Sequence, residues 1–106
     1  ATRVVAITNR IPALDVLVVH RAEGSGTTFV LTDYLARVSP AWAAGPGRGK
    51  DVRWPVGVGG RGTEGVAGLV QRTPGAIGYM EATAARRSGL PMAEVLAPTV
   101  RYAREG

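Results

Sequence analysis

The feature that most constrains the fold is an apolar run that ends in a glycine-rich turn and leads directly into a helix-like segment. Residues 16–19 read Val-Leu-Val-Val, the turn contains Gly24, Ser25 and Gly26, and residues 27–38 carry apolar side chains at helical spacing. A strand, a tight turn and a helix in this order leave backbone N–H groups exposed at the positive end of the helix dipole. The sequence therefore predicts an anion-binding turn.

Three hydroxyl side chains and one arginine accompany this turn. Ser25, Thr27 and Thr28 can donate to an oxygen of an anion, or can accept from the first free N–H groups of the helix. Arg21 follows the apolar run, and its planar guanidinium can hold two oxygens of a phosphate or sulfate at once. These residue types favour an oxyanion as the ligand.

The same residues also fit a capped helix start without any ligand, so this alternative stays open. Gly24 and Gly26 allow a sharp turn and a close approach of the backbone, which an ordinary helix entry also uses. Neither common nucleotide motif is present, because no Gly-Lys-Ser/Thr follows at the Walker spacing and no third glycine completes Gly-x-Gly-x-x-Gly. Anion binding is therefore a simpler interpretation than nucleotide hydrolysis.

Composition narrows the class of protein. A chain of 106 residues with 45% hydrophobic content is large enough for one domain with one core, and we expect residues 1–106 to form it. The absence of cysteine excludes disulfides and thiolate metal sites. The longest apolar run is far shorter than the roughly 20 residues of a membrane span, and no signal-peptide pattern is visible in this chain.

The net charge of +5 raises the question of acidic partners. The basic residues are scattered along the chain and accompany no nucleic-acid motif, so we expect no specific binding of nucleic acid. His20, the single histidine, lies beside Arg21 and is within reach of a bound anion. A lone histidine without a base, nucleophile or metal partner is more often a strand-end residue.

Strand and helix patterns alternate along the chain and predict a three-layer α/β domain with a mostly parallel central sheet. Predicted strands cover 3–8, 16–20, 52–56, 76–80 and part of 92–102, and predicted helices cover 27–38, 63–71 and 81–88. Thr63 is the expected N-cap of the second helix, and residues 43–50 are an expected mobile link. The first helix should bury a broad apolar face formed by Phe29, Val30, Tyr34, Leu35 and Val38.

Four motifs then occur in a characteristic order: residues 18–29, residues 32–42 with Thr-Asp-Tyr-Leu and Val-Ser-Pro, residues 54–62 with Trp-Pro-Val-Gly-Val-Gly-Gly-Arg-Gly, and residues 73–79. They resemble the second lobe of the phosphate-binding proteins that serve bacterial ABC phosphate importers. The resemblance is strongest over residues 16–85. It implies one αβα lobe of a type II periplasmic-binding-protein fold, located in the periplasm or outside the cell, that binds phosphate without catalysis, metal or cofactor.

The resemblance also assigns roles by position. It implies that phosphate is bound by Arg21, Ser25, Gly26 and Thr27. It implies supporting roles for Glu23, Gly24 and Thr28. Glu23 stands where the family usually has an aspartate that orients the arginine. The implied partners are inorganic phosphate, an ABC transporter permease, and a second lobe or a homodimer partner that would complete the cleft.

Other functions remain open from the sequence. An isolated or engineered lobe can be a structural or self-associating module with little ligand binding, and an enzyme acting on phosphorylated substrates would need a nucleophile and base that the sequence does not offer. Alone, the half-site is expected to bind phosphate at about millimolar concentration, roughly 4 kcal/mol. The choice between phosphate and sulfate is undecided, and Glu23 is the only carboxylate near the turn in sequence.

Overall fold

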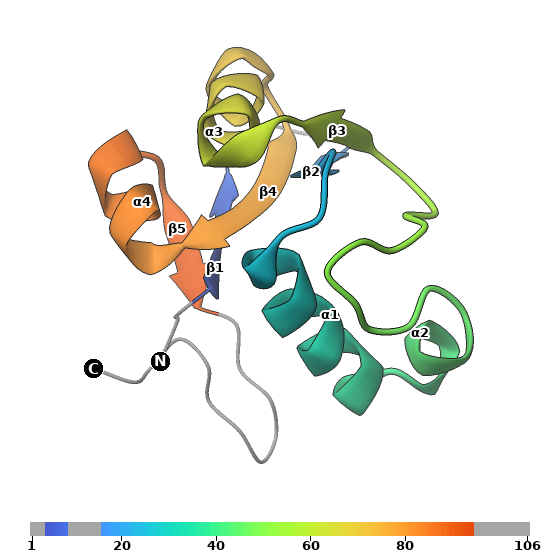
Figure 1. Cartoon of the computed structure of the whole chain (residues 1–106). Helices are drawn as coiled ribbons and strands as arrows, with labels where there is room; N and C mark the ends of the chain where they lie inside the picture. Colours follow the sequence, from blue (N-terminus) through green and yellow to red (C-terminus); the bar gives the residue numbers. More distant parts are fainter. Residues whose placement is uncertain (1–3, 9–15, 95–106) are drawn as a thin grey trace.

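The computed structural model describes residues 4–8 and 16–94. These residues form a five-stranded sheet with helices packed on both of its faces (Figure 1). The strands are β1 (Val4–Thr8), β2 (Leu17–Arg21), β3 (Val58–Gly60), β4 (Ala76–Glu81) and β5 (Met92–Glu94). The helices are α1 (Gly26–Val38), α2 (Pro40–Ala44), α3 (Gly62–Arg72) and α4 (Ala82–Ser88).

The strand order is β3-β2-β4-β1-β5, so the predicted strand that precedes the glycine-rich turn lies inside the sheet. β2 is parallel to both of its neighbours, β3 and β4. β1 is antiparallel to β4 and to β5, so β5 runs in the same direction as β4. The α/β fold class is thus confirmed, with β1 as the strand that runs against the others.

Alternate residues of β4 face different helices, which defines the three layers. Gly78 faces α3 so closely that an added Cβ would lie 3.0 Å from Val66 and 3.1 Å from Val70. Tyr79, the next residue, faces the opposite way and its hydroxyl contacts Thr28 of α1. Helices α3 and α4 therefore cover one face of the sheet, and α1 covers the other (Figure 1).

The most fully buried core lies between the sheet and the α3–α4 layer. It is formed by small and β-branched side chains, which include Val5, Ile7, Val19, Val66, Val70, Ala76, Met80, Ala82 and Ala85. Each large side chain among them contributes about 1.5–3 kcal/mol when it is removed from water. This core holds β2 and β4 next to each other. The carboxyl ends of these two parallel strands therefore lie at the same end of the sheet.

The predicted strand at 52–56 is wrong, and β3 begins later, at Val58. Pro55 lies in the predicted strand and has no N–H for a ladder hydrogen bond. The pairing instead aligns Val58 with Val19, and the Ala22 N–H donates to the Gly60 carbonyl at 2.9 Å. Parallel pairing with β2, a non-local interaction, therefore sets the position of β3.

The predicted apolar face of α1 is also wrong in part. Phe29 is 43% exposed and Val38 is 37% exposed, whereas Thr27, Thr28 and Thr32 are the buried residues of this helix. Threonine is acceptable inside because its hydroxyl is satisfied: Thr32 Oγ1 donates to the Thr28 carbonyl at 2.8 Å. The fully buried positions of α1 are thus occupied by threonines, whereas Phe29 and Val38 are exposed.

Two boundaries differ from the expectation for a physical reason. Ser39 ends α1 and its hydroxyl accepts the Trp42 N–H at 3.1 Å, so a short helix, α2, begins in a stretch that the sequence assigned partly to the link. Helix α3 begins at Gly62, so Thr63 lies in its first turn and is not the N-cap. The expected stop at Gly89 is confirmed, with the left-handed φ of 74° that favours glycine.

Candidate functional site

The candidate site is a crevice at the carboxyl ends of β2 and β4. The chain leaves β2 toward α1 on one face of the sheet and leaves β4 toward α4 on the other face. Where neighbouring parallel strands send their helices to opposite faces, the connections diverge and leave a ligand-sized crevice. A cavity of about 270 Å³ lies there, and it is lined by Arg21, Ser25, Gly26, Thr27 and Glu81.

The first turn of α1 supplies hydrogen-bond donors to this cavity. Ser25 is the N-cap, with extended backbone, and its Oγ accepts the Thr28 N–H at 2.9 Å. The N–H groups of Gly26 and Thr27 precede that capped position, and within the described residues they make no hydrogen bond. An added Cβ at Gly26 would meet nothing within 4 Å, so the backbone is open to the cavity at this point.

The hydroxyl groups behind the turn form a connected network. Ser25 Oγ donates to Thr28 Oγ1 at 2.7 Å, and Thr28 Oγ1 lies 2.6 Å from Tyr79 Oη. Tyr79 Oη in turn accepts the Arg21 N–H at 3.1 Å. Thr28 is buried and fully engaged, so it supports the turn from behind, whereas Thr27 Oγ1 lies 3.1 Å from Ser25 Oγ at the cavity wall.

Glu23 connects the two glycine-rich turns. Its Oε2 lies 3.2 Å from Arg21 Nη2 and accepts the Gly62 N–H at 3.0 Å. Because Arg61, the residue before α3, offers no capping side chain, the Glu23 carboxylate takes that place at the positive end of α3. The hydrogen bond from Arg21, with those from the backbone N–H groups of Glu23 and Gly62, lowers the pKa of the Glu23 carboxyl below 4.5.

The loop that precedes β3 packs against the start and middle of α1. The Ser25 N–H donates to the Lys50 carbonyl at 2.8 Å, and the Gly49 N–H donates to Thr32 Oγ1 at 3.0 Å. An added Cβ at Gly24 would make only ordinary contacts, at 3.7 Å from the same Lys50 carbonyl. The link that the sequence predicted to be mobile is thus hydrogen-bonded to the glycine-rich turn at Ser25 and to α1 at Thr32.

With this geometry in view, comparison with known proteins assigns the fold family. The sequence model of a family described as a PBP superfamily domain matches residues 4–105. The chain belongs to the PBP superfamily.

Three relatives of this PBP superfamily domain are each named phosphate-binding protein PstS. The protein of Pasteurella multocida is 46% identical over 85 residues, which are 80% of this chain and 25% of the relative. That of Xylella fastidiosa (strain Temecula1) is 51% identical over 71 residues, 67% of this chain and 20% of the relative. That of Methanocaldococcus jannaschii is 40% identical over 92 residues, 82% of this chain and 24% of the relative. The chain therefore spans about a quarter of the length of these relatives.

In this PBP superfamily domain, an aromatic stack lies beside the glycine-rich turn that precedes α1. The rings of His20 and Trp54 are parallel within 6°, with centroids 4.9 Å apart, and Trp54 also stacks on Tyr79 at 5.8 Å. His20 Nδ1 lies 3.1 Å from the Arg21 carbonyl, and His20 does not line the cavity. This arrangement agrees with the interpretation of His20 as a strand-end residue.

The structure adds Glu81 and Tyr79 to the predicted site residues. Tyr79 holds the turn from the sheet side, and Glu81 lines the cavity itself. Glu81 could have been found in the sequence, because it follows the predicted strand 76–80 as Arg21 follows the strand before the turn. What the sequence did not contain was the pairing of β2 with β4, which brings the two strand ends together.

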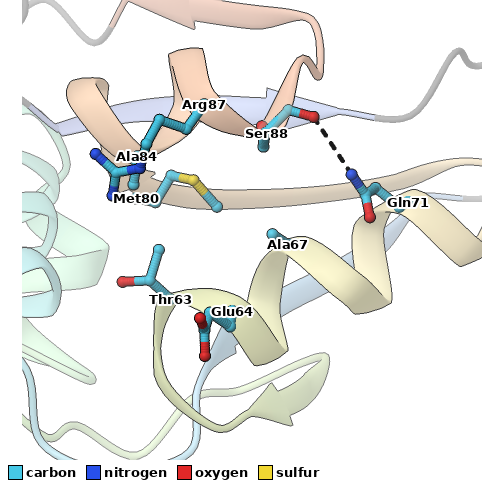
Figure 2. Close-up of a pocket in the computed structure, with 8 residues that line it drawn as sticks. All are labelled: Thr63, Glu64, Ala67, Gln71, Met80, Ala84, Arg87 and Ser88. Atoms are coloured by element: carbon cyan, nitrogen blue, oxygen red, sulfur yellow. Dashed lines mark hydrogen bonds between the residues drawn. The ribbon is translucent and has the colours of Figure 1, made fainter.

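A second pocket, of about 280 Å³, lies between α3 and α4 on the other face of the sheet (Figure 2). Its lining comes from α3 along its length, the end of β4 and α4: Thr63, Glu64, Ala67, Gln71, Met80, Ala84, Arg87 and Ser88. Gln71 Nε2 donates to the Ser88 carbonyl at 3.3 Å and closes one end. None of the predicted phosphate-binding residues lies in this pocket.

Within residues 4–8 and 16–94, no group of His, Cys, Asp or Glu side chains is arranged to hold a metal ion. No helix there is both long and apolar enough to cross a membrane.

Proposed function

We propose that the cavity at the start of α1 binds inorganic phosphate, and that the chain is one lobe of a solute-binding protein for ABC-type phosphate import. The observation that carries this proposal is that Arg21, Ser25, Gly26 and Thr27 line one cavity at a helix N-terminus. The relatives that bear the name phosphate-binding protein PstS support phosphate as the ligand.

Each lining residue has a distinct role in this proposal. The free N–H groups of Gly26 and Thr27 donate to phosphate oxygens at the positive end of α1. Arg21 supplies the positive charge, and Glu23 orients its guanidinium at 3.2 Å. Ser25 and Thr28 keep the turn in its binding conformation through their hydroxyl network, and the loop beside Gly24 supports it through the hydrogen bond from the Ser25 N–H to the Lys50 carbonyl.

The cavity is open to solvent, so an anion bound there keeps much of its hydration. Hydrogen bonds to a solvated anion are weaker than those made in a closed, water-free cleft. We therefore expect an affinity of about 1 mM, roughly 4 kcal/mol, for this chain alone. A second lobe or a second copy of the chain would raise it by closing the crevice. In the proposed transport role, the lobe also has an ABC transporter permease as a partner. It acts in the periplasm or outside the cell, and it binds its ligand without catalysis.

Calorimetric titration with phosphate tests this function, provided that the mass of the protein in solution is measured on the same sample. We expect saturable heat for the wild type and at least about tenfold weaker binding for Arg21→Ala. Arg86→Ala is the matched control, because it removes the same charge from an exposed residue at the end of α4, outside the cavity. Equal loss in both variants would show that diffuse charge, and not the site, attracts the anion.

A further inference from the structure

The pocket between α3 and α4 has an apolar floor (Figure 2). This floor is formed by Met80 of β4, Ala67 of α3 and Ala84 of α4. Met80 is only 1% exposed, and the unbranched thioether side chain of methionine adapts to irregular shapes. The volume of about 280 Å³ lies near the lower limit of about 300 Å³ for pockets that hold small molecules. The pocket therefore has the size and the floor for a small ligand with an apolar part.

Two opposite charges line the same pocket. Glu64 lies in the first turn of α3, three residues before Ala67. Arg87 lies in the last turn of α4, three residues after Ala84. Residues three apart share one face of a helix, so each charge flanks the apolar floor. Within the described part of the chain, neither Glu64 nor Arg87 forms an ion pair or a side-chain hydrogen bond, so both charges are available to a ligand.

The charged side chains lie toward one end of the pocket. The hydrogen bond from Gln71 to the Ser88 carbonyl closes the other end, and Figure 2 shows Thr63, Glu64 and the guanidinium of Arg87 on the side away from this contact. The Arg87 side chain points back toward the start of α4, which is the usual direction of a long side chain on a helix. Its guanidinium is thereby held beside the floor.

These charges favour a ligand that carries both signs. A simple anion would be attracted by Arg87 and repelled by Glu64, and a simple cation would meet the opposite pattern. In a zwitterion, a carboxylate can accept two parallel hydrogen bonds from the Arg87 guanidinium while an ammonium group donates to Glu64. A quaternary ammonium is recognised by aromatic rings, and no aromatic side chain among the described residues lines this pocket, so a primary ammonium is favoured.

We propose that the α3–α4 pocket is a second binding site of this lobe, and that its ligand is a free α-amino acid with an aliphatic side chain. The α-carboxylate pairs with Arg87, the α-ammonium pairs with Glu64, and the aliphatic side chain packs on the floor around Met80. This inference goes beyond the proposed function and does not depend on it, because the pocket shares no lining residue with the cavity at the start of α1.

The test compares three probes by calorimetry at about pH 6, where α-amino groups are protonated and carboxylates are ionised. L-Leucine carries both charges, L-leucinamide lacks the carboxylate, and N-acetyl-L-leucine lacks the ammonium. The wild type should bind L-leucine at least about tenfold more tightly than either analogue, because each analogue leaves one charged group of the pocket without its partner.

Three variants assign each preference to one side chain. Arg87→Gln should abolish the advantage of L-leucine over L-leucinamide, and Glu64→Gln should abolish its advantage over N-acetyl-L-leucine. Arg86→Gln is the matched control: it removes the same charge from the neighbouring exposed residue of α4, which does not line the pocket, and it should keep both preferences. Preferences that are unchanged in Arg87→Gln and Glu64→Gln would overturn the assignment.

The wild type alone also decides the inference. A saturable heat for L-leucine, with amide chemical-shift changes at Ala67 and Ala84, would support it. No saturable heat on folded protein, equal binding of the three probes, or changes centred on Gly26 and Thr27 would overturn it. None of these outcomes bears on the phosphate titration, so a failure here leaves the proposed function standing.

Discussion

Tyr79 Oη lies 2.6 Å from Thr28 Oγ1, and this contact joins the middle of the sheet to the first turn of α1. The same oxygen accepts the Arg21 N–H, so one phenol contacts the residues on both sides of the glycine-rich turn. Burial raises the pKa of Tyr79 above its ordinary value of 10.0, which keeps the phenol neutral and able to serve in both contacts. The turn is therefore braced by the sheet before any ligand arrives.

Removing this phenol should destabilise the fold. Tyr79→Phe leaves the Arg21 N–H without its acceptor and the Thr28 hydroxyl with only its hydrogen bond from Ser25, and we expect a loss of about 1–3 kcal/mol in the free energy of unfolding. Urea unfolding followed by circular dichroism measures it. Thr28→Val, alone and combined with Tyr79→Phe, completes a double-mutant cycle, and strict additivity of the two losses would contradict a direct coupling.

Glu23 should stabilise the protein in a pH-dependent manner. Its pKa is lowered in the folded state from 4.5, chiefly by Arg21, so the unfolded chain binds the proton more tightly. Its contribution is therefore fully present above pH 4.5 and is lost as the pH falls through the lower, folded value. We expect the difference in unfolding free energy between wild type and Glu23→Gln to be larger at about pH 7 than at about pH 3. A difference that does not change with pH would argue against this role.

Two glycines should respond in opposite ways to the addition of one methyl group. Gly57 has a φ of 99° and an added Cβ would collide with the Val18 carbonyl, so Gly57→Ala should cost at least about 2 kcal/mol in unfolding free energy. At Gly26, by contrast, an added Cβ meets nothing within 4 Å, and alanine favours helix. Thermal unfolding of both variants should show a clear loss for Gly57→Ala and no loss for Gly26→Ala.

Gly26→Ala should nevertheless weaken phosphate binding. The methyl group would extend from the backbone that lines the cavity, at the point where the N–H groups are open to a ligand. A titration should show weaker binding in a variant that is as stable as the wild type. Unchanged affinity would mean that the ligand does not approach this part of the turn.

The local parts of this structure could be predicted from the sequence. The strand, turn and helix around residues 21–29 follow from patterns of neighbouring residues, and so does the stop at Gly89. The features that could not be predicted depend on pairing between segments that are distant in the sequence. β3 is positioned by Val19 of β2, and the strand pairing brings Glu81 to Arg21. The hydropathy pattern also predicted the wrong buried face for α1. It contains no information on the hydrogen bonds that allow the Thr28 and Thr32 hydroxyls to be buried.

Mapping of amide chemical shifts can locate the binding of phosphate at the start of α1. In ¹H–¹⁵N spectra recorded during a phosphate titration, we expect the largest saturable changes at the amides of Ser25, Gly26 and Thr27 and at the Nε–H of Arg21. Changes that are confined to the α3–α4 pocket, around Thr63 and Arg87, would contradict it, as would changes spread evenly over the exposed arginines.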